Sequence, residues 1–115
     1  MKTLTLSLKR KWFDMIKSGE KKEEYREIKG KYLDMFCQKL NVTVPNKYNH
    51  FGVDFHLKWP EELGYDTLVF TLGYPKANDT ERRLTFNNPQ IRIGTGKPEW
   101  GAEPGKLYFI IEWEA

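Results

Sequence analysis

Residues 4–26 read LTLSLKRKWFDMIKSGEKKEEYR, and the spacing of apolar residues changes twice within them. Over residues 4–8 every second residue is leucine, which predicts a strand with one aliphatic face. Residues 12–16 place aromatic and aliphatic side chains at helical spacing, so we expect a short amphipathic helix that closes at Gly19. A charged strand over residues 22–28 is expected to follow it.

The charged strand carries side chains of opposite sign on one face. Because successive residues of a strand point to opposite faces, Glu24 and Arg26 should share a face, with Lys22 beside them and Tyr25 opposite. Lys21 lies at the turn just before the strand, so its ammonium can reach the same space. Two interpretations remain open: charges that protect an edge strand from pairing with other chains, or a clamp for phosphate or carbonyl oxygens.

Length and composition indicate one folded domain. The chain has 115 residues, of which 39% are hydrophobic and 15% aromatic. Its single cysteine, Cys37, has no partner for an internal disulfide and falls in an apolar helical pattern, which fits a reducing compartment. The first residues form no apolar run of signal-peptide length, and no stretch approaches the roughly 20 apolar residues of a membrane span. We therefore expect a cytoplasmic protein without membrane contact.

The charge of the chain is uneven. Residues 1–31 hold 10 Lys or Arg against 5 Asp or Glu, a balance of +5, and residues 32–115 hold 9 against 11, a balance of −2, which together give the net +3. A basic amino-terminal part is compatible with a phosphate-facing patch. The same bias also occurs in proteins that bind no nucleic acid, so charge alone does not decide between these classes.

The rest of the chain predicts a second helix and several short strands. The helix follows Gly30 and has an apolar stripe that runs to Leu40. Residues 42–60 predict a long irregular connection with a short strand around 53–57. Further strands are predicted at residues 65–74, 83–86, 90–93 and 107–113, with turns at 75–79, 87–89 and 94–105. We expect an α+β fold in which five or six strands curl into a small β-barrel flanked by two helices.

Several residues outside the charged strand have two interpretations each. Trp59 and Trp100 lie among basic and turn residues, where an indole either stacks on a base or packs in the core. The arginines at residues 82–83 either contact phosphate or solvate a strand end, and we favour the second role. The histidines within residues 50–56 lack zinc spacing and a cysteine partner, so we expect no metal and no cofactor. Trp12 and Phe13 are predicted core residues.

Residues 4–26 together resemble the amino-terminal signature of the ASCH domain, in which a strand, a helix and a turn of the form GxKxxExR follow one another. The four motif positions are occupied by Gly19, Lys21, Glu24 and Arg26. The closing strand YFIIEW after a glycine-rich loop is also similar, whereas residues 41–62 look like an insertion outside the resemblance. The resemblance implies a PUA-like β-barrel with a cleft beside the helix–strand turn, which binds RNA or nucleotides.

We therefore expect RNA, a nucleoside or a nucleotide as the ligand of that cleft. Lys21 and Arg26 would engage phosphate or carbonyl oxygens, and Glu24 would accept hydrogen bonds from a base or hold Arg26 in place. Lys9 and Trp100 complete the expected ligand-binding set. The sequence leaves the oligomeric state open.

A second hypothesis is an enzyme of the same fold. Certain small bacterial ASCH proteins are amidohydrolases that remove the acyl group from 4-acetylcytidine with a lysine, a threonine and a glutamate. Lys21 matches the lysine, but Glu24 stands where the threonine is, and a carboxylate cannot replace a hydroxyl nucleophile without changing the chemistry. Lys21 and Glu24 would then be the acid–base pair of an amidohydrolase that activates water, or of a ribonuclease. A third hypothesis is a protein-interaction module built on the aromatic residues of 48–59.

Overall fold

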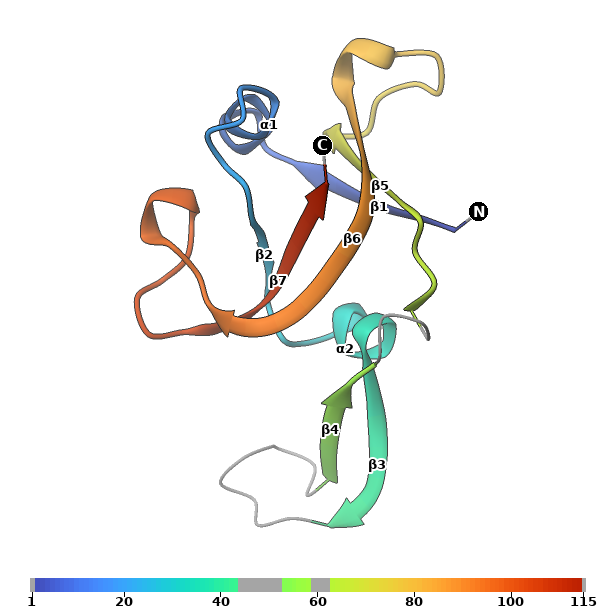
Figure 1. Ribbon diagram of the computed structural model, residues 1–115, viewed down its shortest axis with the longest axis vertical. Coiled ribbons are helices and arrows are strands. Elements are labelled where there is room, and N and C mark those ends of the chain that lie inside the picture. The colour runs from blue at the N-terminus through green and yellow to red at the C-terminus, as the bar shows by residue number, and fades with distance from the viewer. Residues whose placement is uncertain (1, 44–52, 59–62, 115) are drawn as a thin grey trace.

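The computed structural model describes residues 2–43, 53–58 and 63–114 (Figure 1). Its helices and strands, in chain order, are β1 (Thr3–Leu8), α1 (Arg10–Lys17), β2 (Glu24–Arg26), α2 (Lys31–Phe36), β3 (Cys37–Thr43), β4 (Val53–Leu57), β5 (Thr67–Leu72), β6 (Arg83–Thr95) and β7 (Leu107–Glu114). Two short 3₁₀ helices, η1 (Thr80–Arg82) and η2 (Pro98–Trp100), lie on either side of β6. The fold is of the α+β class, as the sequence predicts.

Five of the strands form one curved, mixed sheet in the order β1-β5-β6-β7-β2. β1 and β5 are parallel, and every other neighbouring pair is antiparallel. Figure 1 shows the long strand β6 bending around the body of the molecule with β7 beside it. β1 and β2 are the two edges and do not pair with each other, so the sheet of the described residues is open. The closed barrel therefore stays a prediction.

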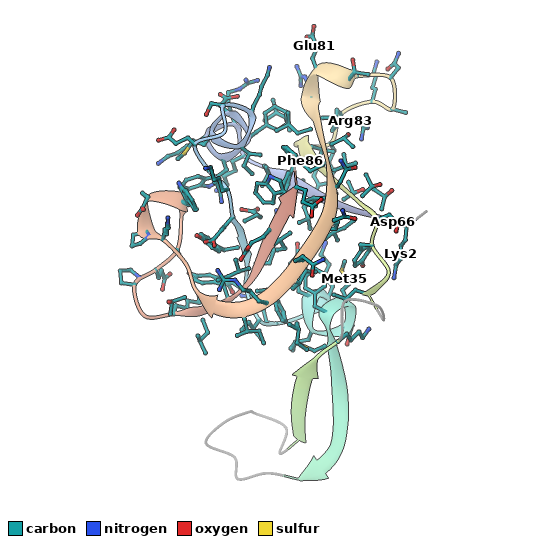
Figure 2. All side chains as sticks on the ribbon, viewed as in Figure 1. Lys2, Met35, Asp66, Glu81, Arg83 and Phe86 are labelled. Carbon is teal, nitrogen blue, oxygen red and sulfur yellow. The ribbon has the colours of Figure 1, made fainter. Side chains whose placement is uncertain are left out.

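The core lies inside the curve of this sheet. Leu4, Leu6 and Leu8 are at most 7% exposed, which confirms the alternation predicted for β1. α1 adds Phe13 and Ile16 to the same cluster. Strands β5, β6 and β7 contribute three aromatic rings that contact one another: Phe70, Phe86 and Trp113. Phe86 points into the interior in Figure 2.

The second helix is shorter than predicted. α2 ends at Phe36, whereas the apolar stripe predicted a helix as far as Leu40. Cys37 has extended backbone angles and begins β3, whose pairing with β4 starts with Cys37 opposite Leu57. Apolar residues at helical spacing also fit a strand when a partner strand is available, so pairing with β4 overrides the helical pattern. β4 occupies residues 53–57, as predicted.

No helix among the described residues is long and apolar enough to cross a membrane.

The turn predicted at residues 87–89 is wrong, because β6 runs through it. Between Asn87 and Gln90 the register against β7 shifts, and Asn88 has a positive φ of 49°. The backbone N–H of Asn88 donates to the carbonyl of Asp66, and its side-chain amide donates to Glu114. Such a bulge leaves a residue outside the ladder of backbone hydrogen bonds and bends the strand. The turn-forming residues at 87–89 therefore bend β6 and do not reverse the direction of the chain.

Candidate functional site

The charged segment begins where α1 ends. Ser18 is the last residue of the helical turn, and Gly19 takes the left-handed conformation expected of it, with φ +85°. The chain then returns along the helix, and the backbone N–H of Lys21 donates to the carbonyl of Met15. This turn points the side chain of Lys21 into the protein, where the residue is only 1% exposed.

The buried ammonium of Lys21 is fully hydrogen-bonded. Its Nζ donates to the carbonyl oxygen of Glu23 at 2.7 Å, to Oε1 of Glu24 at 2.9 Å and to the carbonyl oxygen of Trp100 at 3.2 Å. An ammonium has three N–H donors, so each has an acceptor. The rings of Trp12 and Tyr25 lie 5.3 Å and 5.0 Å from the same nitrogen. Burial lowers the pKa of Lys21, and the attraction of the Glu24 carboxylate opposes that shift.

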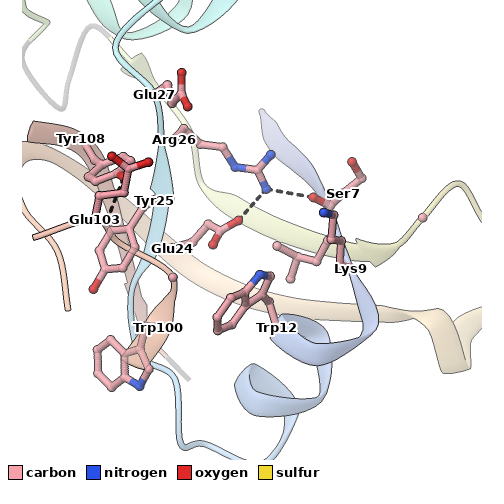
Figure 3. Close-up of a pocket in the computed structure, with 13 residues that line it drawn as sticks. Ser7, Lys9, Trp12, Glu24, Tyr25, Arg26, Glu27, Trp100, Glu103 and Tyr108 are labelled. Atoms are coloured by element: carbon pink, nitrogen blue, oxygen red, sulfur yellow. Dashed lines mark hydrogen bonds and ion pairs between the residues drawn. The ribbon is translucent and has the colours of Figure 1, made fainter. Parts of the chain in front are cut away.

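Glu24 forms ion pairs with both Lys21 and Arg26. Figure 3 shows the pair with Arg26. Oε2 of Glu24 accepts from Nη2 of Arg26 at 2.6 Å, and the same Nη2 donates to the carbonyl of Ser7 on β1 at 2.9 Å. Nη1 of Arg26 donates to the hydroxyl of Tyr32 on α2 at 3.2 Å. Arg26 therefore bridges the two unpaired edges of the sheet, since it belongs to β2 and Ser7 belongs to β1.

The strand geometry agrees with the alternation only in part. Glu24 and Arg26 point to one side of β2 and Tyr25 to the other (Figure 3). The strand is limited to residues 24–26, however, where the sequence predicted 22–28, and Lys22 is exposed outside it. β2 pairs with β7 through three residue pairs, and the turn that buries Lys21 uses the residues before them.

A cavity of about 710 Å³ opens beside this group. Its volume lies within the roughly 300–1,000 Å³ of sites that bind small molecules. The wall is drawn from the end of β1, the start of α1, β2 and the loop between β6 and β7 (Figure 3). The lining residues are Ser7, Leu8, Lys9, Trp12, Glu24, Tyr25, Arg26, Glu27, Gly73, Trp100, Gly101, Glu103 and Tyr108. We call this cavity the cleft.

Four of the five predicted ligand-binding residues line the cleft: Lys9, Glu24, Arg26 and Trp100. The fifth, Lys21, is not among the lining residues and is held against Glu24. Its part in a ligand site would therefore be to fix the carboxylate that faces the cleft.

Sequence reasoning found one aromatic residue of the cleft, Trp100, and missed three others. Trp12 packs against the core, as predicted, but it also lines the cleft, and so do Tyr25 and Tyr108. Trp12 and Tyr25 lie on either side of Lys21 in the sequence, and these two flanking aromatic residues were the available signal. Tyr108 lies on the closing strand, where an apolar run gives no sign that one ring borders a cavity.

The loop between β6 and β7 is fastened to β2 by Tyr25. The hydroxyl of Tyr25 donates to Glu23 and accepts from the backbone N–H of Lys97 at 3.0 Å, and burial raises the pKa of Tyr25 to about 12. A side chain at Gly96 would place its Cβ 2.6 Å from the Tyr25 ring, so this close approach requires glycine. The loop thereby brings the carbonyl of Trp100 to Lys21.

The charges that line the cleft are mixed. Lys9 and Arg26 contribute positive charge, and the carboxylates of Glu24, Glu27 and Glu103 contribute negative charge. The Glu27 carboxylate is paired with Lys29 at 2.7 Å and Lys106 at 3.4 Å, and these two lysines lower the pKa of Glu27. A cleft of this composition suits a ligand with both donors and acceptors better than a polyanion.

The remaining sequence candidates fall elsewhere. Arg82 pairs with Asp79 at 3.3 Å, and Arg83 lines a second cavity. Trp59 and residues 48–52, which include His50, lie outside the described residues, as do the side chains of His56 and Asp54. Within the part of the chain whose side chains are described, no three His, Cys, Asp or Glu residues gather as metal ligands.

Comparison with known proteins gave no assignment. The chain matches no protein-family model, no curated protein and no solved structure. The resemblance to ASCH domains therefore stays a prediction from the sequence, based on residues 4–26 and on the closing strand YFIIEW.

Replacement of Lys21 should reveal the buried pair. Lys21→Met is expected to lower the free energy of unfolding by about 3 kcal/mol, because it leaves the Glu24 carboxylate buried with only Arg26. Adding Glu24→Gln should then cost less than Glu24→Gln costs in the wild type, with a coupling of about 1–3 kcal/mol. Urea denaturation measures all three variants, and the exposed neighbour Lys22→Met should change stability by less than about 0.5 kcal/mol. Losses that simply add would show that Lys21 and Glu24 do not interact.

The lowered pKa of Lys21 also predicts a pH dependence. Since the folded-state pKa lies below the ordinary 10.5, the unfolded chain binds more protons between these two values, and the free energy of unfolding rises with pH there. The stability difference between the wild type and Lys21→Met should therefore grow as the pH rises through the folded-state pKa of Lys21 toward 10.5. Urea midpoints of both proteins across this range provide the measurement. A difference that shrinks would mean that attraction to Glu24 outweighs burial.

Proposed function

We propose that this chain is an ASCH-like protein that binds a nucleobase, as part of RNA or of a nucleoside-type ligand, in the cleft. The observation that supports this most directly is the combination of aromatic walls with a fixed carboxylate–guanidinium pair. Trp12 and Trp100 offer indole rings for stacking, and Glu24 and Arg26 offer an acceptor and a donor beside them. Base stacking on such rings is worth about 1–3 kcal/mol per base and does not depend on base identity.

Polar recognition of the base edge is assigned to Glu24 and Arg26. Lys21 and Arg26 hold the Glu24 carboxylate in one orientation, and a carboxylate has further lone pairs for a donor on the base. Among the described residues, Nε of Arg26 is buried without a hydrogen-bond partner. A site whose groups are held before the ligand arrives loses less conformational entropy on binding. Lys9 at the rim is suited to ribose or phosphate oxygens.

We also infer that the curved sheet is the PUA-like barrel of this family. The support comes from Arg26, which joins the β2 edge to Ser7 on the β1 edge, and from Tyr32, which brings α2 over the same gap. In this view the side chain of Arg26 joins the β1 and β2 edges, where a closed barrel would have backbone hydrogen bonds. The cleft lies in that interval, beside the helix–strand turn.

An amidohydrolase is the second candidate. It is favoured by one observation: Lys21, whose pKa is lowered by burial, touches a carboxylate that lines the cleft. Against it stand the glutamate at the threonine position and the three acceptors that already occupy the N–H groups of Lys21. The same pair would have to serve a ribonuclease, and the same objections hold.

Trp100→Ala should weaken nucleoside or RNA binding by roughly fivefold to one hundredfold, because it removes one stacking ring. Trp100→Tyr should retain most of the affinity. Isothermal titration calorimetry with cytidine and with a short oligoribonucleotide measures the change. The matched control is Leu107→Ala, which removes an apolar side chain that is 55% exposed and lies outside the cleft lining. Equal affinities for wild type, Trp100→Ala and Leu107→Ala would contradict base stacking at this site.

Incubation with 4-acetylcytidine separates binding from catalysis. The proposed function predicts binding without release of acetate, because the cleft holds a carboxylate where the hydroxyl nucleophile would be. Chromatography of the nucleoside after prolonged incubation provides the readout. Acetate release that is lost in Glu24→Gln would replace the binding proposal with the amidohydrolase.

A further inference from the structure

A second cavity, of about 270 Å³, adjoins the cleft and shares Ser7 and Gly73 with it. It lies between the edge strand β1, the start of α2, the end of β5 and the start of β6. Its volume is below that of sites that enclose a whole small molecule, so it suits one chemical group of a larger ligand. Because the two cavities adjoin, a group bound in the second cavity would lie next to the part of the ligand that is bound in the cleft.

The charges of the two cavities are opposite in character. Three glutamates line the cleft, whereas the second cavity has Lys31 and Arg83 and no carboxylate among its lining residues. Hydroxyl groups from Thr5 and Ser7 add further hydrogen-bonding capacity to the same lining, whereas the hydroxyl of Thr71 donates to the carbonyl of Gly73. A cavity with two cations, hydroxyls and no acid is suited to an anion.

Arg83 is the one arginine without a carboxylate partner in the described part of the chain. Each of the other four arginines forms an ion pair: Arg10 with Asp14, Arg26 with Glu24, Arg82 with Asp79, and Arg92 with Glu23 and Glu112. Arg83 lies at the start of β6 in Figure 2, and its hydrogen bonds to the described residues are long: Nη2 donates to the carbonyls of Pro75 at 3.4 Å and Lys76 at 3.3 Å. Its Nε is buried and has no partner among the described residues. A guanidinium in this state retains capacity for an oxyanion.

We infer that the second cavity is a phosphate subsite and that the ligand of the cleft is therefore a phosphorylated nucleotide or an RNA strand, not a free nucleoside. Lys31 and Arg83 hold the phosphate while the base lies in the cleft, where the three glutamates disfavour a second anion. Tyr74, which is 96% exposed at the rim of this cavity, is available for the ribose or base that follows. This inference rests on the proposed function, because it assigns the group attached to the base.

The test compares cytidine, cytidine 5′-monophosphate, cytidine 3′-monophosphate and a short oligocytidylate by calorimetry. We expect the phosphorylated ligands to bind at least about tenfold more tightly than cytidine, because a charge-assisted contact is gained. The two monophosphates and the oligonucleotide distinguish a terminal phosphate from a phosphodiester of a longer strand. For the oligonucleotide, Arg83→Gln should also reduce the slope of log affinity against log salt by about one.

Arg83→Gln and Lys31→Gln should each remove most of the advantage of the phosphorylated ligands and leave cytidine affinity unchanged. Arg82→Gln is the matched control, because it removes the same charge from the neighbouring residue, which pairs with Asp79 and does not line the second cavity. If Arg83→Gln lowers the melting temperature, the affinities of Lys31→Gln provide the test, because Lys31 is exposed. Equal affinity for cytidine and its phosphates, or equal losses in Arg82→Gln and Arg83→Gln, would overturn the phosphate subsite while the base site stands. Failure of every ligand to bind would overturn the proposed function and this inference together.

Discussion

The Nζ of Lys21 is buried beside the rings of Trp12 and Tyr25, and a buried ammonium must find an acceptor for each of its N–H groups. The acceptors come from the entry to β2 and from the loop that precedes β7, so the charge of one side chain fixes where that loop lies. Glu24 also accepts a hydrogen bond from Arg26, and Arg26 in turn donates hydrogen bonds to β1 and α2. Four segments of the chain, namely β1, the turn with β2, α2 and the loop before β7, thus depend on one connected set of hydrogen bonds.

Such a group is better suited to fixing geometry than to adding stability. Taking ions out of water costs free energy that their attraction roughly balances, so a buried pair is weak support for a fold but costly to break. Here it holds β1 and β2 at a defined separation without a backbone ladder between them. Aromatic rings and a fixed carboxylate then border the interval between the two edges. In our proposal the phosphate subsite lies next to it, where Lys31 and Arg83 have no carboxylate partner among the described residues, and the two cavities would divide base and phosphate between them.

The sequence predicted what depends on neighbouring residues. The alternation of β1, the stop at Gly19 and the shared side of Glu24 and Arg26 follow from local periodicity and turn chemistry. The burial of Lys21 did not, because it depends on Trp12, Tyr25 and a carbonyl far along the chain meeting at one point. The helix predicted to Leu40 and the turn predicted at 87–89 failed for the same reason: strand pairing, a contact between distant residues, overrode the local pattern.

The central claim is that Lys21 is a buried, fully hydrogen-bonded ammonium that positions Glu24. Nuclear magnetic resonance of a sample with ¹⁵N-labelled lysine tests it directly, since an exposed ammonium exchanges its protons with water too quickly to be observed near neutral pH. The account predicts one protected Nζ signal that disappears in Lys21→Met and shows contacts to the ring protons of Trp12 and Tyr25. The absence of a protected lysine signal, or one without those ring contacts, would contradict it.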